Sequence, residues 1–514
     1  MSPRGGNIGV PLLPLYSQPV TVKQQPLTSE EREFFALLTE VIFSNPFSFQ
    51  KDRLASLGSQ IQGPTPVPDD HHYSALIPPL EQWLARLESR GLCRIQAVPL
   101  QDRRLLQYAF LFQLYDRYVA QWDQLIQTQM VKGAAPAPVP FAEELIDKLQ
   151  NRGFSIEEAG RYLALFYQLR RAYFFIAHAL VGDSPSMTRL RHALWNNVFT
   201  TDARFYADHL WDRMEDFSTL LLGETGTGKG SAAAAIGRSG LIPFDLKSRR
   251  FTYSFTETFI AINLSQFPES LIESELFGHR KGAFTGAIDN HKGLFQRCSP
   301  HGALFLDEIG DVSVPVQIKL LNVLQERQFT PVGSHSPLRF AGRVIAATHR
   351  SLPALRREGQ FRDDFYYRLS SDVIEVPPLR RRLQESPAEL KQLVGLLAKR
   401  LTGQAAEDLI DRILQVLNKC LPADYAWPGN VRELEQAVRR IILKGDYQGA
   451  EAPTDHGSWL CQATQGKLSA PQLLAAYCQM LYRRHGTYEA VATITALDRR
   501  TVKKHVQAGA SKED

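Results

Sequence analysis

The sequence lacks the features that mark secreted, metal-binding and membrane-spanning proteins. Only five cysteines occur in 514 residues, and they form no CxxC pair and accompany no histidine cluster at metal-ligand spacing. This pattern predicts free thiols in a reducing compartment rather than a disulfide framework or a zinc site. The chain also has no uncharged apolar run of about 20 residues, and its first residues lack a basic-then-apolar signal. We therefore expect a cytoplasmic protein without a membrane partner.

A strong excess of charge of either sign is also lacking. The 59 lysines and arginines exceed the 54 aspartates and glutamates by five, too few to mark the whole chain as a nucleic-acid coat. The excess is local, because residues 467–514 hold eight basic and four acidic residues and so carry +4 of the net +5. A contact with a polyanion is therefore expected at the carboxyl-terminal end.

Composition and hydrophobic periodicity divide the chain into five parts. A length of 514 residues predicts about three domains, and 44% hydrophobic with 22% charged residues exclude wholesale disorder. We predict a mainly helical regulatory domain over residues 1–182, an α/β subdomain with a parallel sheet over 183–378, and a helical subdomain over 379–447. A linker over 448–466 leads to an all-α domain over 467–514.

One apolar stripe in the amino-terminal part leaves two interpretations open. After Ser155, residues recur at alternating spacings of four and three, namely Tyr162, Phe166, Leu169, Tyr173, Ile176 and Leu180. Such spacing is typical of a short coiled coil between two chains, and equally of the core stripe of one helical domain. Fewer than three heptads are present, which favours the core. Nothing in residues 1–182 identifies a ligand, a metal or a haem, and the strand–helix alternation of a phosphoacceptor receiver is missing.

A glycine-rich loop connects an apolar strand to an alanine-rich helix. The loop consists of Gly223, Glu224, Thr225, Gly226, Thr227, Gly228 and Lys229, and Gly230 and Ser231 follow it. This is the pattern of a P-loop, in which backbone N–H groups and a helix N-terminus surround phosphates and Lys229 reaches the terminal ones. We therefore expect ATP to bind here. Gly230 stands where the general motif has a Mg²⁺-binding hydroxyl, and Ser231 lies one residue too late.

Two further apolar strands end in polar residues. The first ends at Asp307 and Glu308, and the second ends at Thr348 and His349. The carboxyl ends of parallel strands beside a P-loop face the nucleotide. Asp307 is therefore predicted to hold Mg²⁺, and Glu308 is predicted to orient the attacking water. Thr348 and His349 are candidates for sensing the γ-phosphate.

Downstream motifs carry a resemblance to a known family. Gly282, Ala283, Phe284, Thr285, Gly286 and Ala287 spell GAFTGA, and ESELFGH precedes them at 273–279. GQFRDDFYYRL follows at 359–369, PPLR at 377–380 and WPGNVREL at 427–434. In these motifs the chain resembles the bacterial enhancer-binding proteins, the NtrC-like AAA+ ATPases that activate sigma-54 RNA polymerase. The resemblance covers roughly residues 184–442, about half of the chain.

The resemblance implies an AAA+ core, with an α/β subdomain and a helical lid, that assembles as a hexameric ring. Asn263 matches the asparagine that restrains Glu308 until nucleotide is bound. Arg362 and Arg368 match the arginine fingers that reach the neighbouring subunit's site, and Arg432 matches the second sensor in the lid. The GAFTGA segment matches the loop that contacts sigma-54 when ATP is bound and withdraws after hydrolysis.

The chain also departs from the pattern of this family. Gly230 replaces the usual glutamate, His349 replaces the usual asparagine, and Leu264 and Ser265 replace a typical Cys-Ala pair. The connection over residues 240–256 is longer than usual. The first two changes could weaken metal or γ-phosphate sensing. We interpret them as tuning rather than loss, because the carboxylate pair and both finger arginines are intact.

The basic tail resembles a Fis-type helix-turn-helix, which is common at the end of such activators. Helices are predicted over residues 471–484, 487–495 and 499–506, with Asp498 as an N-cap and Ala496 where the turn usually has glycine. The last helix would present five residues to the major groove and the flanking phosphates of DNA, namely Arg499, Arg500, Thr501, Lys503 and Lys504. The alternative is a small helical cap with a solvated basic face.

The function predicted from these observations is a sigma-54-dependent regulator. It would bind upstream double-stranded DNA and use ATP and Mg²⁺ to remodel the sigma-54 holoenzyme at a closed promoter. An alternative is a DNA-binding regulator with an idle ATPase that acts by occupancy, which Gly230 and His349 favour. A stand-alone P-loop phosphotransferase is a third possibility, but no acceptor-site motif is present and two finger arginines are.

Overall fold

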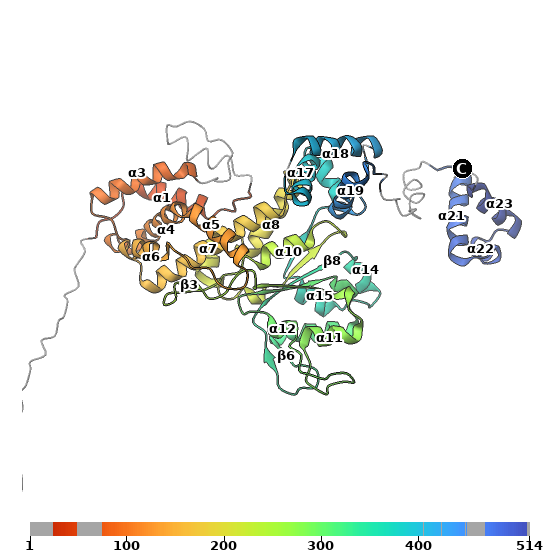
Figure 1. Ribbon diagram of the computed structural model, residues 1–514, viewed down its shortest axis with the longest axis horizontal. Helices are drawn as coiled ribbons and strands as arrows, with labels where there is room; N and C mark the ends of the chain where they lie inside the picture. The colour runs from red at the N-terminus through yellow and green to blue at the C-terminus, as the bar shows by residue number, and fades with distance from the viewer. Residues whose placement is uncertain are drawn as a thin grey trace, which may run out of the picture. The chain divides into compact units, whose positions relative to one another are not determined.

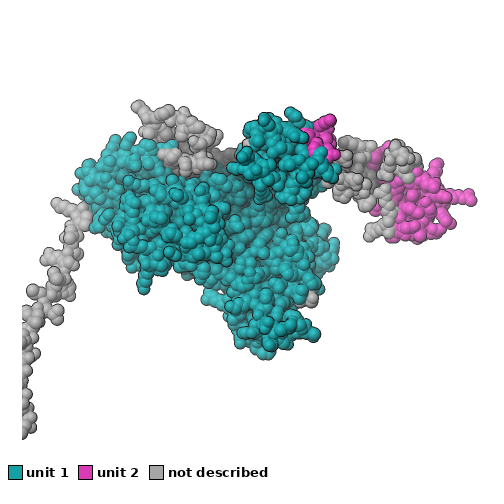
Figure 2. All heavy atoms as spheres, in the orientation of Figure 1, with its two compact units in different colours: residues 1–415, 424–444 teal, residues 416–423, 445–514 magenta. Residues whose placement is uncertain are grey.

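The computed structural model describes residues 24–48, 74–404, 406–422, 424–447, 449 and 468–510. It divides into two compact units, residues 1–415 with 424–444 and residues 416–423 with 445–514 (Figure 2). The predicted linker over 448–466 lies outside the described residues, apart from residue 449. None of the helices that the structure describes is long and apolar enough to cross a membrane.

The amino-terminal part is built of helices, as its periodicity predicts (Figure 1). The main ones are α1 (Ser29–Ile42), α3 (Ile77–Ser89), α4 (Leu100–Arg117), α5 (Val119–Lys132), α6 (Ala142–Asn151), α7 (Ile156–Ala179) and α8 (Pro185–Phe199). Capping boxes begin α1 and α7, where Thr28 and Ser155 accept the N–H groups of Glu31 and Glu158. Each cap satisfies backbone donors that a helix start otherwise leaves unpaired.

The apolar stripe of α7 packs inside the chain's own core. Tyr162, Phe166, Ile176 and Leu180 are buried there, while Leu169 and Tyr173 are partly buried against the same cluster. This arrangement agrees with the interpretation of the stripe as the core of one helical domain. It leaves too little of the stripe exposed to form the seam of a coiled coil between two chains.

A five-stranded parallel sheet forms the centre of the first unit. Its strands are β1 (Thr219–Leu222), β4 (Phe259–Asn263), β5 (Ala303–Asp307), β8 (Arg343–Thr348) and β9 (Asp372–Glu375), in the order β4-β5-β8-β1-β9. Asn263 pairs in register with Asp307, and Leu222 pairs with Thr348. The carboxyl ends of these strands therefore meet at one edge of the sheet, where open α/β sheets bind ligands.

Helices cover both faces of the sheet, because alternate strand residues point to opposite sides. On one face, Leu221, Phe305 and Ile345 share a core with α10 (Lys229–Gly237) and the amino-terminal helices. On the other face, Leu220 and Leu304 share a second core with five helices from the part of the chain between β4 and β9 (Figure 1). Those helices are α11 (Glu269–Phe277), α12 (Leu294–Arg297), α13 (Val314–Glu326), α14 (Leu352–Arg357) and α15 (Asp363–Leu369).

The helical segment after the sheet begins beside the strand ends. It contains α16 (Leu379–Glu385), α17 (Glu389–Thr402), α18 (Glu407–Cys420) and α19 (Asn430–Lys444). The parallel sheet and these helices have the AAA+ arrangement of an α/β core followed by a helical lid, as predicted.

The long connection over residues 240–256 packs against the amino-terminal helices. It contains the short antiparallel strands β2 (Phe244–Asp245) and β3 (Arg250–Phe251). The ring of Phe251 stacks on Tyr167 of α7 with the ring centroids 4.2 Å apart. Ser254 Oγ donates a hydrogen bond of 2.8 Å to the carbonyl of Gly133. The extra length therefore packs against the amino-terminal part, which its sequence did not indicate.

The carboxyl-terminal helices form a small body of their own. They are α21 (Ala470–His485), α22 (Tyr488–Thr495) and α23 (Arg499–Ala510), packed around Cys478, Leu481, Val491 and Val502. Ala496 lies between α22 and α23 in the left-handed region, with φ of 56°. Asp498 Oδ1 accepts the N–H groups of Arg500 and Thr501 at 2.9 and 3.0 Å and caps α23. The structure thus contains the predicted three helices and cap.

Candidate functional site

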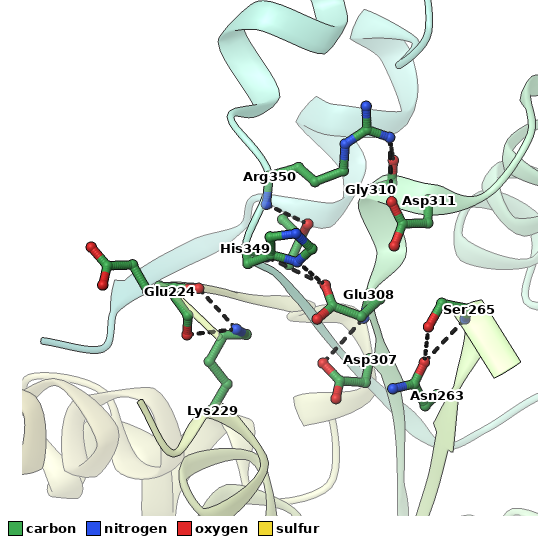
Figure 3. A network of polar contacts seen from close by, with 12 residues as sticks. Glu224, Lys229, Asn263, Ser265, Asp307, Glu308, Gly310, Asp311, His349 and Arg350 are labelled. Carbon is green, nitrogen blue, oxygen red and sulfur yellow. Dashed lines mark hydrogen bonds and ion pairs between the residues drawn. The ribbon is translucent and has the colours of Figure 1, made fainter. Parts of the chain in front are cut away.

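The glycine-rich loop lies between β1 and α10 and closes around its own lysine (Figure 3). Gly226 and Gly228 have φ of 80° and 104°, which residues with a Cβ rarely adopt. Lys229 is buried, and its Nζ donates to the carbonyls of Gly223 and Glu224 at 2.8 and 3.1 Å. Burial lowers the pKa of Lys229, and the negative charges of Glu308 and Asp307 oppose this effect.

The space in front of the loop fits a polyphosphate. A Cβ built on Gly228 or on Gly230 would meet no atom within 4 Å. The first N–H groups of α10 have no partner inside the helix, and the helix dipole adds positive potential at this end. Lys229 adds a charged donor. Gly230 and Ser231 are both exposed beside this space, so the hydroxyl that the general motif places at Gly230 is absent.

Two carboxylates stand at the carboxyl end of β5, next to the loop (Figure 3). Asp307 is partly buried, and burial together with the charge of Glu308 raises the pKa of its carboxyl group. Glu308 adopts φ of 56°, a left-handed conformation that is unusual for a residue with a side chain. Among the described residues, no group of three or more potential ligands forms a metal cage. A metal bound at Asp307 would therefore need oxygen ligands from nucleotide and water, which is how Mg²⁺ usually binds phosphates.

His349 holds the second carboxylate. Its Nδ1 lies 2.7 Å from Glu308 Oε2, and its backbone N–H donates to the same oxygen at 3.4 Å. A carboxylate only accepts hydrogen bonds, so the Nδ1 proton is on the ring in this contact. The preceding residue, Thr348, is buried, and its Oγ1 accepts the N–H of Arg350 at 3.1 Å. Sequence reasoning placed His349 near the γ-phosphate but missed its bond to Glu308.

Asn263 has a different partner from the one that the family resemblance implies. Its Oδ1 accepts the N–H of Ser265 at 3.0 Å and the hydroxyl of Ser265 at 2.7 Å (Figure 3). In this structure, the carboxylate of Glu308 is instead in contact with His349. Ser265 and His349 are both positions where the chain departs from the family pattern. The role of Asn263 in restraining Glu308 stays a prediction.

The helical lid is clamped to the glycine-rich loop by residues that sequence reasoning missed. Arg380 donates from both terminal nitrogens to the carboxylate of Glu224, at 2.8 and 2.5 Å. Asn430 Nδ2 donates to Glu224 Oε2 and to the carbonyl of Thr225, each at 3.1 Å. The hydrogen bonds from Arg380 lower the pKa of the Glu224 carboxyl group. The signals were present, since Arg380 ends the PPLR motif and Asn430 belongs to WPGN.

Arg432 also lies at this contact, in the first turn of α19. The Cβ of Arg432 is 3.0 Å from the position that a Cβ on Gly226 would take. Its positive charge adds to the lowering of the Lys229 pKa that burial causes, and it partly opposes the rise in the pKa of Asp307. Arg432 is exposed, so its guanidinium is accessible to a bound nucleotide. The structure therefore brings this predicted residue to the loop, although its role as a sensor stays a prediction.

The two predicted finger arginines have different surroundings. Arg362 is exposed and forms a bidentate pair with Asp364 at 3.0 and 2.7 Å. Arg368 is partly buried and donates through Nε and NH2 to the carbonyl of Leu324 at 3.0 and 2.8 Å. Within the described chain, no hydrogen bond or ion pair joins either arginine to the glycine-rich loop of the same subunit.

The GAFTGA segment forms a turn that projects beyond α11 and α12 (Figure 1). Gly282 and Gly286 have φ of 82° and 101°, and the N–H of Gly282 donates to the carbonyl of Ala287 at 2.8 Å. Phe284 keeps 41% of its surface exposed, although its ring lies edge-on to His279 with centroids 4.9 Å apart.

The predicted DNA-contacting residues lie on the first two turns of α23. Arg499, Arg500, Lys503 and Lys504 are exposed, and Arg499 pairs with Glu489 at 2.9 Å. Thr501 is only partly exposed, and its hydroxyl donates to Asp498 at 2.5 Å. Thr501 is therefore engaged in the helix cap, and the four basic residues remain the candidates for contact with DNA.

Comparisons with known proteins assign the central domain. Residues 207–375 match the model of the family described as the sigma-54 interaction domain. The transcriptional regulator NtrC of Azospirillum brasilense is 39% identical over 268 residues, which are 51% of this chain and 47% of the relative. The regulatory protein ZraR of Klebsiella oxytoca is 40% identical over 270 residues, 52% of this chain and 53% of the relative. The chain thus spans about half the length of these relatives.

A solved structure is also similar. NtrX from Brucella abortus aligns over 71% of this chain and 79% of its own, with 20% identity and a TM-score of 0.38. The family match covers the glycine-rich loop, the carboxylate pair and the GAFTGA segment. The central part of this chain therefore matches a sigma-54 interaction domain and has the AAA+ fold, and it is similar in sequence to the regulators NtrC and ZraR.

Proposed function

We propose that this protein hydrolyses ATP in a ring of identical subunits and uses the energy to remodel the sigma-54 holoenzyme at promoters to which it binds. One observation carries the proposal. The glycine-rich loop, Asp307, Glu308 and Arg432 meet at one edge of the sheet, in a domain whose GAFTGA turn is exposed. The sigma-54 interaction family and its relatives support the assignment of the partner.

ATP and Mg²⁺ fit the residues of the site. Lys229 and the first N–H groups of α10 would hold the phosphates, and the carboxylate of Asp307 would hold the metal ion. When bound, the metal neutralises charge on the phosphates. Occupancy by phosphate would give Lys229 a new acceptor in place of the carbonyls of Gly223 and Glu224. The lid residue Arg432 would then close on the nucleotide from the opposite side.

His349 limits the orientation of Glu308. Its two contacts hold Oε2, and they leave the second carboxylate oxygen, Oε1, to accept a hydrogen bond from water. We assign to His349 the restraint that the family resemblance places on Asn263, because in this structure His349 is the residue that bonds the Glu308 carboxylate. Nucleotide binding that moves His349 would then let Glu308 turn toward the attacking water.

The exposed arginine supports hydrolysis between subunits. Arg362 lies exposed at the surface in a pair with Asp364, and exchange of this partner would let it stabilise charge on a phosphoryl group in a neighbouring subunit. Mixing Arg362→Ala subunits with Glu308→Ala subunits tests this arrangement. One type of interface then combines an intact Glu308 with an intact Arg362, and hydrolysis should exceed the sum of the two separate variants. Mixtures that assemble without any gain would contradict it.

The GAFTGA turn supplies the contact with sigma-54. Thr285 is exposed at its tip and makes no contact that nucleotide chemistry requires. Thr285→Ala should therefore keep ATP hydrolysis and ring assembly but lose nucleotide-dependent binding to sigma-54 and fail to open promoters. Full open-complex formation by this variant would overturn the assignment of the turn.

The basic tail supplies the contact with upstream DNA. The exposed Arg499, Arg500, Lys503 and Lys504 lie on α23, which begins at the cap of Asp498. Truncation before Lys467 should abolish site-specific binding and leave hydrolysis intact. Arg499→Ala should relax sequence preference if its side chain reads a base edge, whereas uniform weakening across sequences would identify a phosphate contact.

The second candidate function is a regulator whose ATPase is idle. The engagement of Glu308 by His349 and the missing hydroxyl at Gly230 favour it. Steady-state hydrolysis at rising protein concentration separates the two functions. The ring ATPase predicts a specific activity that climbs as subunits assemble. A rate of zero across the whole assembly range would leave only the idle regulator.

A further inference from the structure

A cavity of about 140 Å³ lies among the amino-terminal helices, outside the nucleotide site. Its walls are mainly aromatic and aliphatic, and they include Phe43, Tyr108, Leu111, Phe166, Leu169 and Trp195. An apolar cavity of roughly 150 Å³ is large enough to hold benzene. The volume therefore matches a single aromatic ring, and the walls match its surface.

The three charged residues in the walls, Asp116, Arg170 and Asp208, already have interaction partners. Arg170 forms two hydrogen bonds of 2.6 Å with the carboxylate of Asp123, and Asp208 lies 3.6 Å from Arg104. Burial raises the pKa of the Tyr108 and Tyr162 hydroxyls, so both stay neutral. A charged ligand would enter this cavity without a counter-charge, which is unfavourable. The chemistry therefore selects a neutral molecule.

Helix α7 joins this cavity to the ATPase domain through two different faces. Tyr162, Phe166, Leu169 and Tyr173 line the cavity at spacings of three and four residues, which places them on one side of the helix. Residues between them point the other way. Gln168 Nε2 donates to the carbonyl of Ser239 at 3.0 Å. A shift of α7 that accommodates a ligand on one face therefore moves contacts on the other.

The strongest of these contacts reaches the helix that follows the glycine-rich loop. Arg171 is fully buried, and its two terminal nitrogens donate to the carbonyls of Arg238 and Gly240, each at 2.7 Å. These carbonyls lie just past the end of α10, where a cation also complements the helix dipole. Lys229 begins the same helix. Arg171 and the phosphate-binding lysine thus sit at opposite ends of one short rigid element.

Helix α8 provides a second connection, to the lid. Trp195 of α8 lines the cavity, while Ser184 stands at the N-cap position of this helix. The N–H of Ser184 donates to Glu389 Oε2 at 3.1 Å, and the N–H of Ser186 donates to Glu385 at 2.6 Å. Both acceptors belong to the lid helices α16 and α17. The cavity therefore touches helices that contact both sides of the nucleotide site.

We propose that this cavity is the sensory site of the protein and binds a small neutral molecule with one aromatic ring. Its occupancy shifts α7 and α8, and through Arg171 and the start of α8 it changes the positions of α10 and the lid. The binding step stands on the cavity alone. The regulatory step rests on the proposed function, because it assumes that the site at Lys229 hydrolyses ATP.

Binding is tested first, with toluene as the probe and the full chain as the sample. Titration should give saturable binding, seen by calorimetry and by a change in tryptophan fluorescence that Trp195→Phe removes. Benzoate, which has the same ring and a negative charge, should not bind. Absence of saturable toluene binding would overturn the proposal whatever the ATPase does. Equal binding of benzoate would overturn the assignment of a neutral ligand.

A cavity-filling variant and a matched control locate the binding. Ala207 lines the cavity and Ala193 is a partly buried alanine of α8 outside it. Ala207→Leu should weaken toluene binding at least ten-fold, whereas Ala193→Leu should leave it unchanged. Circular dichroism of both variants checks that they fold. If Ala207→Leu does not fold, Leu165→Phe, which narrows the cavity from α7, replaces it as the cavity-filling variant. Unaltered affinity in a folded filling variant would place the probe elsewhere and overturn the site.

Transmission is tested by hydrogen exchange, which does not depend on hydrolysis. Toluene should change exchange of the α10 amides, residues 229–237, at least two-fold in the unmodified chain and not in Arg171→Lys. Saturating toluene should change the rate of ATP hydrolysis at least two-fold with the same dependence on Arg171. Binding without any change at α10 would overturn the transmission step. A change at α10 in a protein with no hydrolysis would instead contradict the proposed ATPase and leave the sensory site standing.

Discussion

The sheet and the amino-terminal helices share one hydrophobic core. The candidate sites that they form differ, because one is lined by polar groups and the other by apolar ones. At the strand ends, polar groups such as Lys229, Asp307 and Glu308 face a space that the loop leaves open. In the amino-terminal helices, charged groups are paired and an apolar cavity remains. Phosphate binding needs particular donors at particular positions, whereas an apolar cavity needs only volume and hydrophobic walls.

This difference explains why one region is recognisable in sequence and the other is not. The motifs of the nucleotide site are short, contiguous and rich in glycine and charge. The walls of the cavity come from α1, α4, α5, α7, α8 and residues 206–210, and most wall residues are apolar residues of an ordinary helix core. Many combinations of apolar residues would enclose the same volume. A search for sequence motifs therefore finds the nucleotide site and misses the cavity.

The largest expected effect is a difference in hydrolysis rate between a variant of the nucleotide site and a variant of the cavity. Glu308→Gln should lower the rate of ATP hydrolysis by about 10²–10⁴-fold, because the amide cannot accept a proton from the attacking water. Ala207→Leu should leave the unliganded rate unchanged, because Ala207 lines only the cavity. Steady-state hydrolysis of the two variants side by side measures this contrast. Near-normal turnover in Glu308→Gln would remove Glu308 from the chemistry.

The next effect concerns the junction of the two regions. Arg171→Met should lower the free energy of unfolding of the first unit by about 3 kcal/mol, because two charge-assisted hydrogen bonds are lost and buried carbonyls are left unpaired. Arg400→Met changes an exposed arginine and should have little effect. Urea unfolding, followed by fluorescence, measures both. A loss equal to that of the control would show that the two regions are not held by this contact.

A smaller effect tests the restraint on the carboxylate. His349→Ala should raise the basal rate of hydrolysis about 2- to 10-fold, because one hydrogen bond no longer holds Glu308. Nucleotide affinity should stay the same. Ser265→Ala is the matched control, since it loosens Asn263 and leaves His349 on Glu308. A fall in the rate of His349→Ala would mean that His349 assists hydrolysis rather than restraining it.

The smallest effect lies in the carboxyl-terminal helices, where a motif position departs from its usual residue. Ala496→Gly should stabilise these helices by roughly 0.5 kcal/mol, since relief of the left-handed strain exceeds the added entropy of the unfolded chain. Ala492→Gly, inside α22, should destabilise them by about 1 kcal/mol. Hydrogen exchange of the α22 and α23 amides measures both changes. Equal destabilisation by the two variants would contradict the strain at Ala496.

Much of the fold was predictable because it depends on local patterns. Alternating apolar strands and helices predicted the parallel sheet, and the polar residues that follow two strands predicted a shared edge. The cap at Asp498 and the stripe of α7 were visible in the spacing of residue types. The docking of the connection over 240–256 was not predictable, because no local signal names the partner of a long loop.

The residues that form the nucleotide site were predictable from the sequence, but the contacts between them were not. The sequence by itself determined which chemical groups stand at the strand ends, since motif spacing places Lys229 at a helix start and Glu308 after a strand. Only the tertiary structure decided that His349 engages Glu308, that Ser265 engages Asn263, and that a buried arginine ties α7 to α10. The physical reason is that a hydrogen bond forms between groups brought within about 3 Å and held there. That proximity depends on strand register and on burial against other elements, neither of which a short motif contains.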